Sequence, residues 1–151
     1  EIGLIRSSLP GYASLAVYPY EKEEIVAICK PYHRLMQNGD ILDIAQLADY
    51  PLAVPFDCLD LVRSSFGHRL LAPNISIITS SNATAIEWAR SFGTVALASL
   101  TTADFQHIKD LAVKHFSDDN LFITSAFIVN KEYPLSRAAR NFLGFHGVDV
   151  G

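Results

Sequence analysis

The chain has 151 residues, of which 50% are hydrophobic and 19% are charged, and its formal net charge is −4. This length favours one domain or two small lobes, and this composition excludes a disordered chain. The longest nearly apolar runs, 95–100 and 121–129, are far shorter than the ~20 residues of a membrane helix. We therefore expect no membrane segment. A chain with this charge has no electrostatic means of gripping a nucleic-acid backbone by itself.

The N-terminus and the cysteines indicate a cytoplasmic protein. No basic region precedes the apolar run at 2–5, so the pattern of a signal peptide is missing. Cys29 and Cys58 are too few for a disulfide framework. We predict that both are reduced, buried, structural thiols.

The N-terminal part of the chain contains apolar runs typical of strands. Residues 2–5 read as a buried strand, and a loop follows. Residues 15–20 alternate apolar and aromatic side chains before a solvated charged run at 21–23. The continuous apolar run 25–29 fits a strand buried on both faces.

From residue 43 onward, short helices and strands alternate. The predicted helices are 43–49, 57–69, 81–92, 101–116 and 135–145. The predicted strands are 52–54, 75–79, 94–98 and 121–129. For the helix that starts at Thr101, the hydroxyl of Thr101 and the carboxylate of Asp104 suit a cap, and its apolar face has helical spacing: Phe105, Ile108, Leu111, Ala112 and Phe116. This alternation predicts an α/β fold with a mostly parallel sheet and helices on both faces.

The sequence shows no pattern for a cofactor, a metal ion or catalysis. It contains no GxGxxG, no phosphate-binding loop and no GxSxG. His107 and His115 stand two turns apart on one predicted helix, too far to share a metal ion. The acidic segment 118–120 lacks the calcium-loop spacing and reads as a turn. We therefore predict no cofactor, no metal site and no enzyme.

Polar residues follow two predicted strands at the edge where ligands bind in parallel α/β sheets. Ser80, Ser81 and Asn82 come after the strand 75–79. Ser80 or Ser81 could simply cap the next helix, or the same hydroxyls and free backbone N–H groups could bind an anion. A second turn, Phe56-Asp57-Cys58, follows the strand 52–54.

One cation also stands at a predicted strand end. Arg6 follows the run 2–5. Its guanidinium could pair with a carboxylate, or it could be an ordinary exposed side chain.

Six segments resemble the effector-binding domain of LysR-type transcriptional regulators, in the order in which that family has them. They include an acidic-apolar-Gly-apolar strand, a Pro-x-His turn and a Leu-Ser-Arg-Ala-Ala-Arg ending: 1–6, 18–28, 31–35, 41–52, 80–88 and 133–143. The chain departs from the family in two places. Segment 90–99 has one glycine and no proline, and the turn before Ser80 lacks an acidic residue.

The resemblance implies a two-lobed fold of the type 2 periplasmic-binding-protein kind. Residues 23–115 would form the second effector-binding lobe, and residues 1–22 with 116–151 the remnant of an incomplete first lobe. A small anionic metabolite would bind in the cleft between the lobes, at these residues: Arg6, Phe56, Asp57, Cys58, Ser80, Ser81 and Asn82. The protein would be a homodimer or higher homo-oligomer, and it would contact DNA only through an N-terminal winged helix-turn-helix absent from this chain.

Two alternatives share this architecture. The chain could be a solute-binding lobe of a transport system or a regulatory lobe of an enzyme. It could also bind no ligand and serve only in dimerisation.

Overall fold

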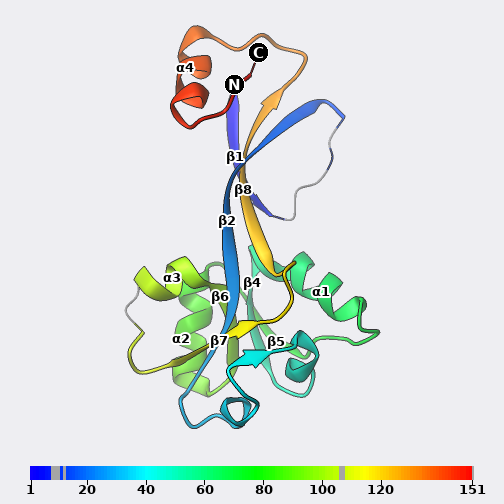
Figure 1. Ribbon diagram of the computed structural model, residues 1–151, viewed down its shortest axis with the longest axis vertical. Coiled ribbons are helices and arrows are strands. Elements are labelled where there is room, and N and C mark those ends of the chain that lie inside the picture. The colour runs from blue at the N-terminus through cyan, green and yellow to red at the C-terminus, as the bar shows by residue number, and fades with distance from the viewer. Residues whose placement is uncertain (8–10, 12, 106–107, 151) are drawn as a thin grey trace. The chain divides into compact units, whose positions relative to one another are not determined.

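The computed structural model describes residues 1–7, 11, 13–105 and 108–150. The chain divides into two compact units: a first unit, Glu1–Lys22 with Thr124–Gly151, and a second unit, Glu23–Ile123. Two strands carry the chain from one unit to the other, β2 (Leu15–Cys29) and β8 (Phe122–Asn130) (Figure 1). In the part of the chain that the structure describes, no helix has the length and apolar character needed to cross a membrane.

The second unit is built on a mixed sheet. Its main strands lie in the order β5 (Ile75–Thr79), β4 (Leu52–Pro55), β6 (Val95–Ser99) and β2. β4 is parallel to β5 and to β6, whereas β2 is antiparallel to β6. At the other side of β2, β7 (Ala112–Phe116) pairs antiparallel with it and parallel with the short β3 (Ile41–Leu42).

The predicted α/β class is confirmed, but the sheet is mixed rather than mostly parallel. Between β4 and β6 each strand is followed by a helix, and such crossovers return the chain in the same direction. β2 enters the sheet without such a crossover, so nothing forces it to run parallel to β6.

Helices cover both faces of this sheet: α1 (Leu59–Gly67) on one face and α2 (Asn82–Phe92) with α3 (Leu100–Phe105) on the other (Figure 1). Successive side chains of a strand point to opposite faces. One buried cluster therefore combines alternate residues of β2 with α1: Ile25, Ala27, Cys29, Val62 and Phe66. The other combines the remaining ones with α2: Val26, Ile28, Ala85, Ile86 and Ala89. The run 25–29 is indeed buried on both faces, as predicted.

Three short 3-10 helices complete the second unit: Arg34–Gln37, Ile44–Leu47 and Phe56–Cys58. The helix predicted at 43–49 is the second of these. Asp43 caps it, accepting a hydrogen bond from the Ala45 N–H at 2.8 Å, and Gln46 completes a capping box.

The helix predicted from Thr101 to Phe116 is wrong from residue 108 onward, and residues 106 and 107 lie outside the described residues. α3 ends at Phe105, and Ala112–Phe116 is the strand β7. The apolar spacing fits a helix as well as a short strand. Residues 112–116 form a strand because their backbone groups pair with those of β2 and β3. The cap also lies earlier than Thr101, because the Ser99 Oγ accepts a hydrogen bond from the Thr102 N–H at 3.3 Å.

The charged run 21–23, predicted to be solvated, lies within a strand and does not interrupt the chain's extended conformation. β2 continues without a gap from Leu15 to Cys29. Its residues 19–22 are exposed, so charged side chains can remain in water while the backbone stays extended.

The first unit is smaller and has one buried cluster. β1 (Ile2–Ser7) runs antiparallel to β8, with Ile2 opposite Val129 and Ser7 opposite Thr124. The helix α4 (Arg137–Phe145) contributes Leu143 to a cluster with Phe127, Val129 and Val148. Gly3 permits a close approach, since a Cβ atom there would lie 2.7 Å from the Cγ1 of Ile128.

Candidate functional site

Three parallel strands of the second unit end at the same edge of the sheet. In the register of β4 and β5, Pro55 lies opposite Thr79, and β6 ends at Ser99. Each strand is followed directly by a helical segment: the 3-10 helix Phe56–Cys58, α2 and α3 (Figure 1). We refer to the residues that follow these strand ends as the carboxyl edge.

The first turn of α2 is fixed by local hydrogen bonds. Ser81 is the cap: its Oγ accepts from the Thr84 N–H at 3.2 Å and lies 3.0 Å from the Thr84 Oγ1. The Thr79 hydroxyl donates to the Ser81 carbonyl at 2.9 Å. Of the two serines that sequence reasoning offered as caps, Ser81 has this role, and the exposed Ser80 is left to face solvent.

Asn82 joins two of the strand ends. Its side chain is buried, and its Oδ1 accepts a hydrogen bond from the Ser99 N–H at 2.8 Å. The contact holds the start of α2 against the end of β6. Asn82 therefore positions the edge rather than presenting its side chain to solvent.

The third strand end contributes a pair of hydroxyls that sequence reasoning missed. The Ser99 Oγ lies 2.8 Å from the Thr102 Oγ1, and Ser99 is fully buried while Thr102 is half-buried. The signal for this pair was a Ser directly after an apolar strand. The hydroxyl of Thr101 two residues later gives the same signal, so the sequence alone does not single out Ser99.

The turn after β4 has one exposed and one buried end. Phe56 is 72% exposed and Asp57 is half-buried, whereas Cys58 is fully buried in the cluster beneath α1. The Cys58 thiol donates a hydrogen bond to the Asp57 Oδ1 at 3.5 Å. Phe56 and Asp57 are thus the accessible residues of this turn.

Arg6 belongs to the first unit. It lies on β1, half-buried, opposite Ser125 of β8. The other site residues predicted from the sequence all belong to the second unit.

Among the described residues, the cysteines, histidines and acidic side chains form contacts of a structural kind. Both cysteines are free and buried, as predicted, and burial raises the pKa of Cys29 to about 11. The described residues contain no group of three or more His, Cys, Asp or Glu arranged to hold a metal ion. His107 lies outside the described residues, and His115 pairs with Glu24 at 2.7 Å. Asp118 closes a turn by accepting from the Asn120 N–H at 2.9 Å.

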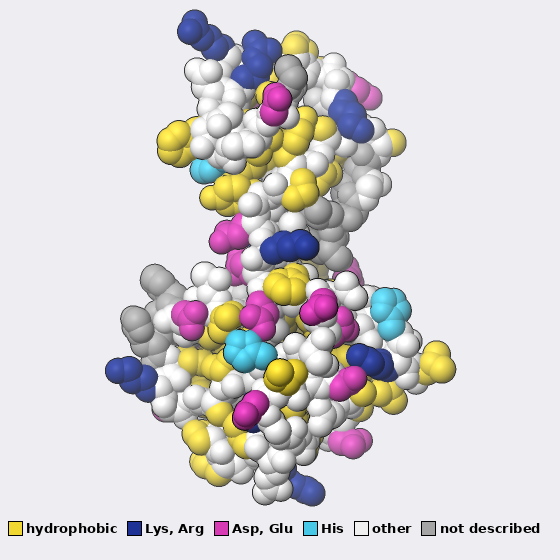
Figure 2. Space-filling model, viewed as in Figure 1, with side chains coloured by type: hydrophobic (Ala, Val, Ile, Leu, Met, Phe, Trp, Pro, Cys, Tyr) yellow, Lys and Arg dark blue, Asp and Glu magenta, His cyan; other side chains and the backbone are white. Residues whose placement is uncertain are grey.

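One face of the second unit shows how its charged side chains are distributed (Figure 2). On the face shown in Figure 2, the Lys and Arg side chains of the part that carries α1 and α2 stand apart, with acidic side chains between them. This distribution agrees with the net charge of −4 and gives no basic patch on that face for a nucleic-acid backbone.

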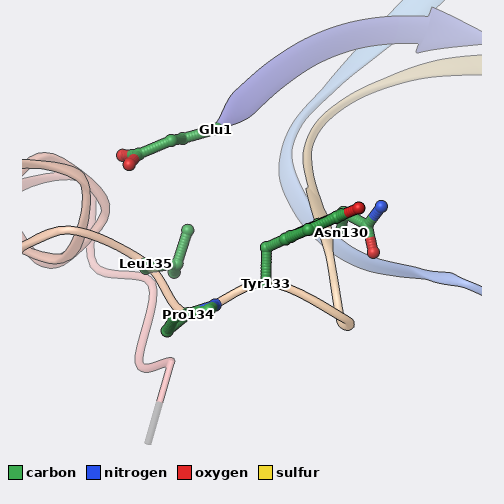
Figure 3. A pocket seen from close by; sticks show the side chains of 5 residues that line it. All are labelled: Glu1, Asn130, Tyr133, Pro134 and Leu135. Atoms are coloured by element: carbon green, nitrogen blue, oxygen red, sulfur yellow. The ribbon is translucent and has the colours of Figure 1, made fainter.

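The first unit contains a cavity of about 460 Å³. Figure 3 shows its lining, with Glu1 just before β1, Asn130 at the end of β8, and residues 133–135 leading to α4. Glu1 also accepts a hydrogen bond from the Ser136 hydroxyl at 2.7 Å. Its carboxylate gives the cavity a negative charge, which does not suit an anionic ligand.

The chain matches the LysR substrate binding domain family over residues 1–146. It belongs to this family. The chain is therefore an effector-binding domain of LysR type, a class that is not enzymatic, and the prediction of no enzyme is confirmed. The family match also favours the regulator over a transport or enzyme lobe. No curated protein sequence matches the chain.

Solved structures of LysR regulators share the fold. The effector binding domain of QuiR in complex with shikimate has a TM-score of 0.80 and 18% identity, over 95% of this chain and 69% of that one. The regulatory domain of Synechocystis PCC6803 CcmR in complex with 2-PG has a TM-score of 0.79 and 15% identity, over 96% of this chain and 71% of that one.

Full-length CbnR complexed with its target DNA has a TM-score of 0.75 and 16% identity, over 96% of this chain and 50% of that one. The chain thus spans half the length of this full-length regulator. At these identities the likeness establishes the fold.

Proposed function

We propose that this chain is the sensor of a LysR-type transcriptional regulator and binds a small anionic metabolite at the carboxyl edge. The observation that carries the proposal is the convergence of three parallel strand ends, Pro55, Thr79 and Ser99, each followed by a helical segment. Ligands of open α/β sheets bind at such edges. The relatives QuiR and CcmR were solved with shikimate, a carboxylate, and with 2-PG, respectively.

The start of α2 supplies the donors for an anion. The first N–H groups of a helix have no partner within the helix, and Ser81 satisfies that of Thr84. The N–H groups of Asn82 and Ala83 lie at the same terminus, where the helix dipole favours negative charge. The exposed Ser80 hydroxyl adds a donor that the cap does not use.

The proposed contacts also include Phe56 and Asp57, and Arg6 from the first unit. Phe56 offers an exposed aromatic face for the apolar part of a metabolite. Asp57 would accept hydrogen bonds from hydroxyl groups of the metabolite. The family resemblance, which implies a cleft between two lobes, adds Arg6 because a guanidinium binds a carboxylate through two parallel hydrogen bonds. Cys58 and Asn82 act beneath this surface by holding the turns in place.

The proposal extends to the whole regulator. Effector binding would change how two or more subunits pack, and a winged helix-turn-helix outside this chain would contact DNA in the cytoplasm. The net charge of −4 supports the assignment of DNA contact to another segment.

Thermal unfolding in the presence of shikimate, 2-PG, amino acids and other carboxylates tests the proposal. A ligand at ~100 times its Kd adds about 2.7 kcal/mol to the free energy of unfolding. For a chain of this length we expect the Tm to rise by roughly 5–10 °C. The variant Ser80→Ala should lower that rise without changing the Tm of the ligand-free protein. If no carboxylate raises the Tm of the intact regulator, the proposed function is wrong.

A further inference from the structure

The second unit also has a groove at the opposite edge of its sheet, where β4 and β6 begin and β2 ends. Its volume is about 590 Å³, within the range of small-molecule sites. The lining comes from three separate segments. Lys30, Tyr32, His33 and Arg34 follow β2, Asp49 and Tyr50 precede β4, and Ser91 to Gly93 precede β6. We call it the amino-edge groove.

Two cations line the amino-edge groove without a carboxylate partner. Within the described parts of the chain, neither Lys30 nor Arg34 forms an ion pair. The Lys30 Nζ lies 5.8 Å from the centre of the Tyr32 ring, a cation–π contact that leaves its hydrogen-bond donors available. Asp49 is the carboxylate in the lining. Positive charge therefore exceeds negative charge, which favours an anion.

The groove also exposes aromatic surface. Tyr32 is 79% exposed and Phe92 is 64% exposed. The Phe92 ring packs on Trp88 at a centroid distance of 4.3 Å, and Tyr50 packs on His33 at 5.1 Å. These contacts hold the rings of Phe92 and Tyr50 in place. A flat ligand could therefore cover these two rings at little cost in side-chain freedom.

His33 adds a fixed hydrogen-bond donor. Its Nδ1 accepts from the Leu35 N–H at 3.1 Å, and burial lowers the pKa of the imidazole. The neutral ring then carries its proton on Nε2, which makes that nitrogen a donor.

We propose that the amino-edge groove is a second ligand site, separate from the carboxyl edge, that takes a small aromatic carboxylate. The carboxylate would bind Lys30 and Arg34, and the ring would lie against the exposed faces of Tyr32 and Phe92. The site does not depend on the proposed effector function, because it shares none of the carboxyl-edge residues.

The test uses benzoate, with two matched probes that each lack one feature. Cyclohexanecarboxylate keeps the charge without the aromatic ring, and benzamide keeps the ring without the charge. At about 10 mM, a concentration that reveals a Kd of ~1 mM, benzoate should shift the backbone amide signals of Tyr32 and Gly93 in NMR spectra of the protein. The signals of Ser80 and Ser81 should stay in place. Trp88, the single tryptophan, should report the same binding by a change in fluorescence through its contact with Phe92.

Variants at exposed positions give the second arm. Lys30→Gln and Arg34→Gln should each weaken benzoate binding about threefold, as expected for a partly solvated ion pair. Tyr32→Ala should weaken it by up to about tenfold through the lost stacking. Arg63→Gln, which removes an exposed cation on α1, is the matched control and should leave the Kd unchanged.

Three results would overturn the proposal. In one, benzoate moves no signal around Gly93, or it moves those of Ser80 and Ser81 instead. In another, cyclohexanecarboxylate or benzamide binds as tightly as benzoate. In the last, Arg63→Gln weakens binding as much as Arg34→Gln. A shift of the Ser80 and Ser81 signals would instead support anion binding at the carboxyl edge, whereas the other results leave that proposal untouched because its variants are different.

Discussion

The two units differ in how their hydrophobic residues are buried. In the second unit both faces of the sheet are covered, and two clusters of fully buried side chains lie between strands and helices. In the first unit the strands and α4 share one small cluster of four buried side chains: Phe127, Val129, Leu143 and Val148. We infer that the second unit's own core holds its fold, so large-to-small substitutions there should lower the free energy of unfolding more.

The largest effect is expected in the core beneath α1. Phe66 is fully buried, so Phe66→Ala should lower the free energy of unfolding by about 3–5 kcal/mol. Denaturant unfolding followed by circular dichroism measures this. Arg63→Ala, on the exposed side of the same helix, should stay within about 0.5 kcal/mol of the parent. A loss of less than about 1 kcal/mol for Phe66→Ala would contradict the comparison of the two units.

The corresponding change in the first unit is Leu143→Ala. Leu143 is fully buried, but its neighbours Ile2, Tyr18 and Leu135 are only partly buried and can close part of the space. We expect a loss of about 2–3 kcal/mol, near the low end for such substitutions. Hydrogen exchange should speed up in β1 and α4 and remain slow in β4 and β6. Equal acceleration in β4 would show that the two units unfold together.

A third prediction concerns the charge that the first unit offers to a ligand. Arg6→Ala should weaken binding of an anionic effector by about 1.5–3 kcal/mol, the contribution of a charged hydrogen bond. Titration calorimetry with the carboxylate that raises the Tm most gives the Kd. Arg137→Ala, at an exposed position of α4, is the control. An unchanged Kd for Arg6→Ala removes the first unit from the proposed site.

The helix caps give smaller and nearly equal effects in the two units. Ser81 caps α2 and Ser136 caps α4, each through a hydrogen bond of 3.2 Å from the N–H three residues later. Ser81→Ala and Ser136→Ala should each lower the free energy of unfolding by about 1 kcal/mol. Ser80→Ala should not change it, since Ser81 is the cap. A larger loss for Ser80→Ala than for Ser81→Ala in thermal unfolding would reverse these assignments.

The last prediction is a pH dependence in the second unit. Burial raises the pKa of Cys29 to about 11 from an ordinary value of 9.0. The folded protein therefore holds the thiol proton more tightly than the unfolded chain. The contribution is fully present below pH 9.0 and is lost as the pH rises to about 11. Denaturant unfolding across this range should show a decline that Cys29→Ala reduces, and an identical decline in both proteins would contradict it.

Much of the second unit follows from local patterns. The apolar runs at 25–29, 52–54 and 75–79 became β2, β4 and β5, and the hydroxyl before α2 became its cap. These features depend on neighbours in the sequence: apolar periodicity, proline and side-chain capping. Local patterns failed at β7, whose partners are β2 and β3, far away along the chain.

In the candidate site, too, some residues are recognisable from local sequence and others depend on contacts between distant elements. Ser80, Ser81 and Phe56 were recognisable because each follows an apolar strand directly. That these residues lie near one another depends on the register of β4 with β5. The Asn82–Ser99 hydrogen bond likewise joins two separate elements, α2 and β6. The amino-edge groove had no signal at all, because its lining comes from three segments that only the sheet brings together.

By itself, the sequence determined the α/β class, most of the strands and helices, and the resemblance to LysR effector domains. Tertiary structure alone decided the direction of β2 in the sheet, the conversion of 112–116 into a strand, and which hydroxyls and cations share an edge. The physical reason is the range of the interactions. Side-chain periodicity and capping act within a few residues, whereas backbone pairing between strands depends on partners far apart in the chain.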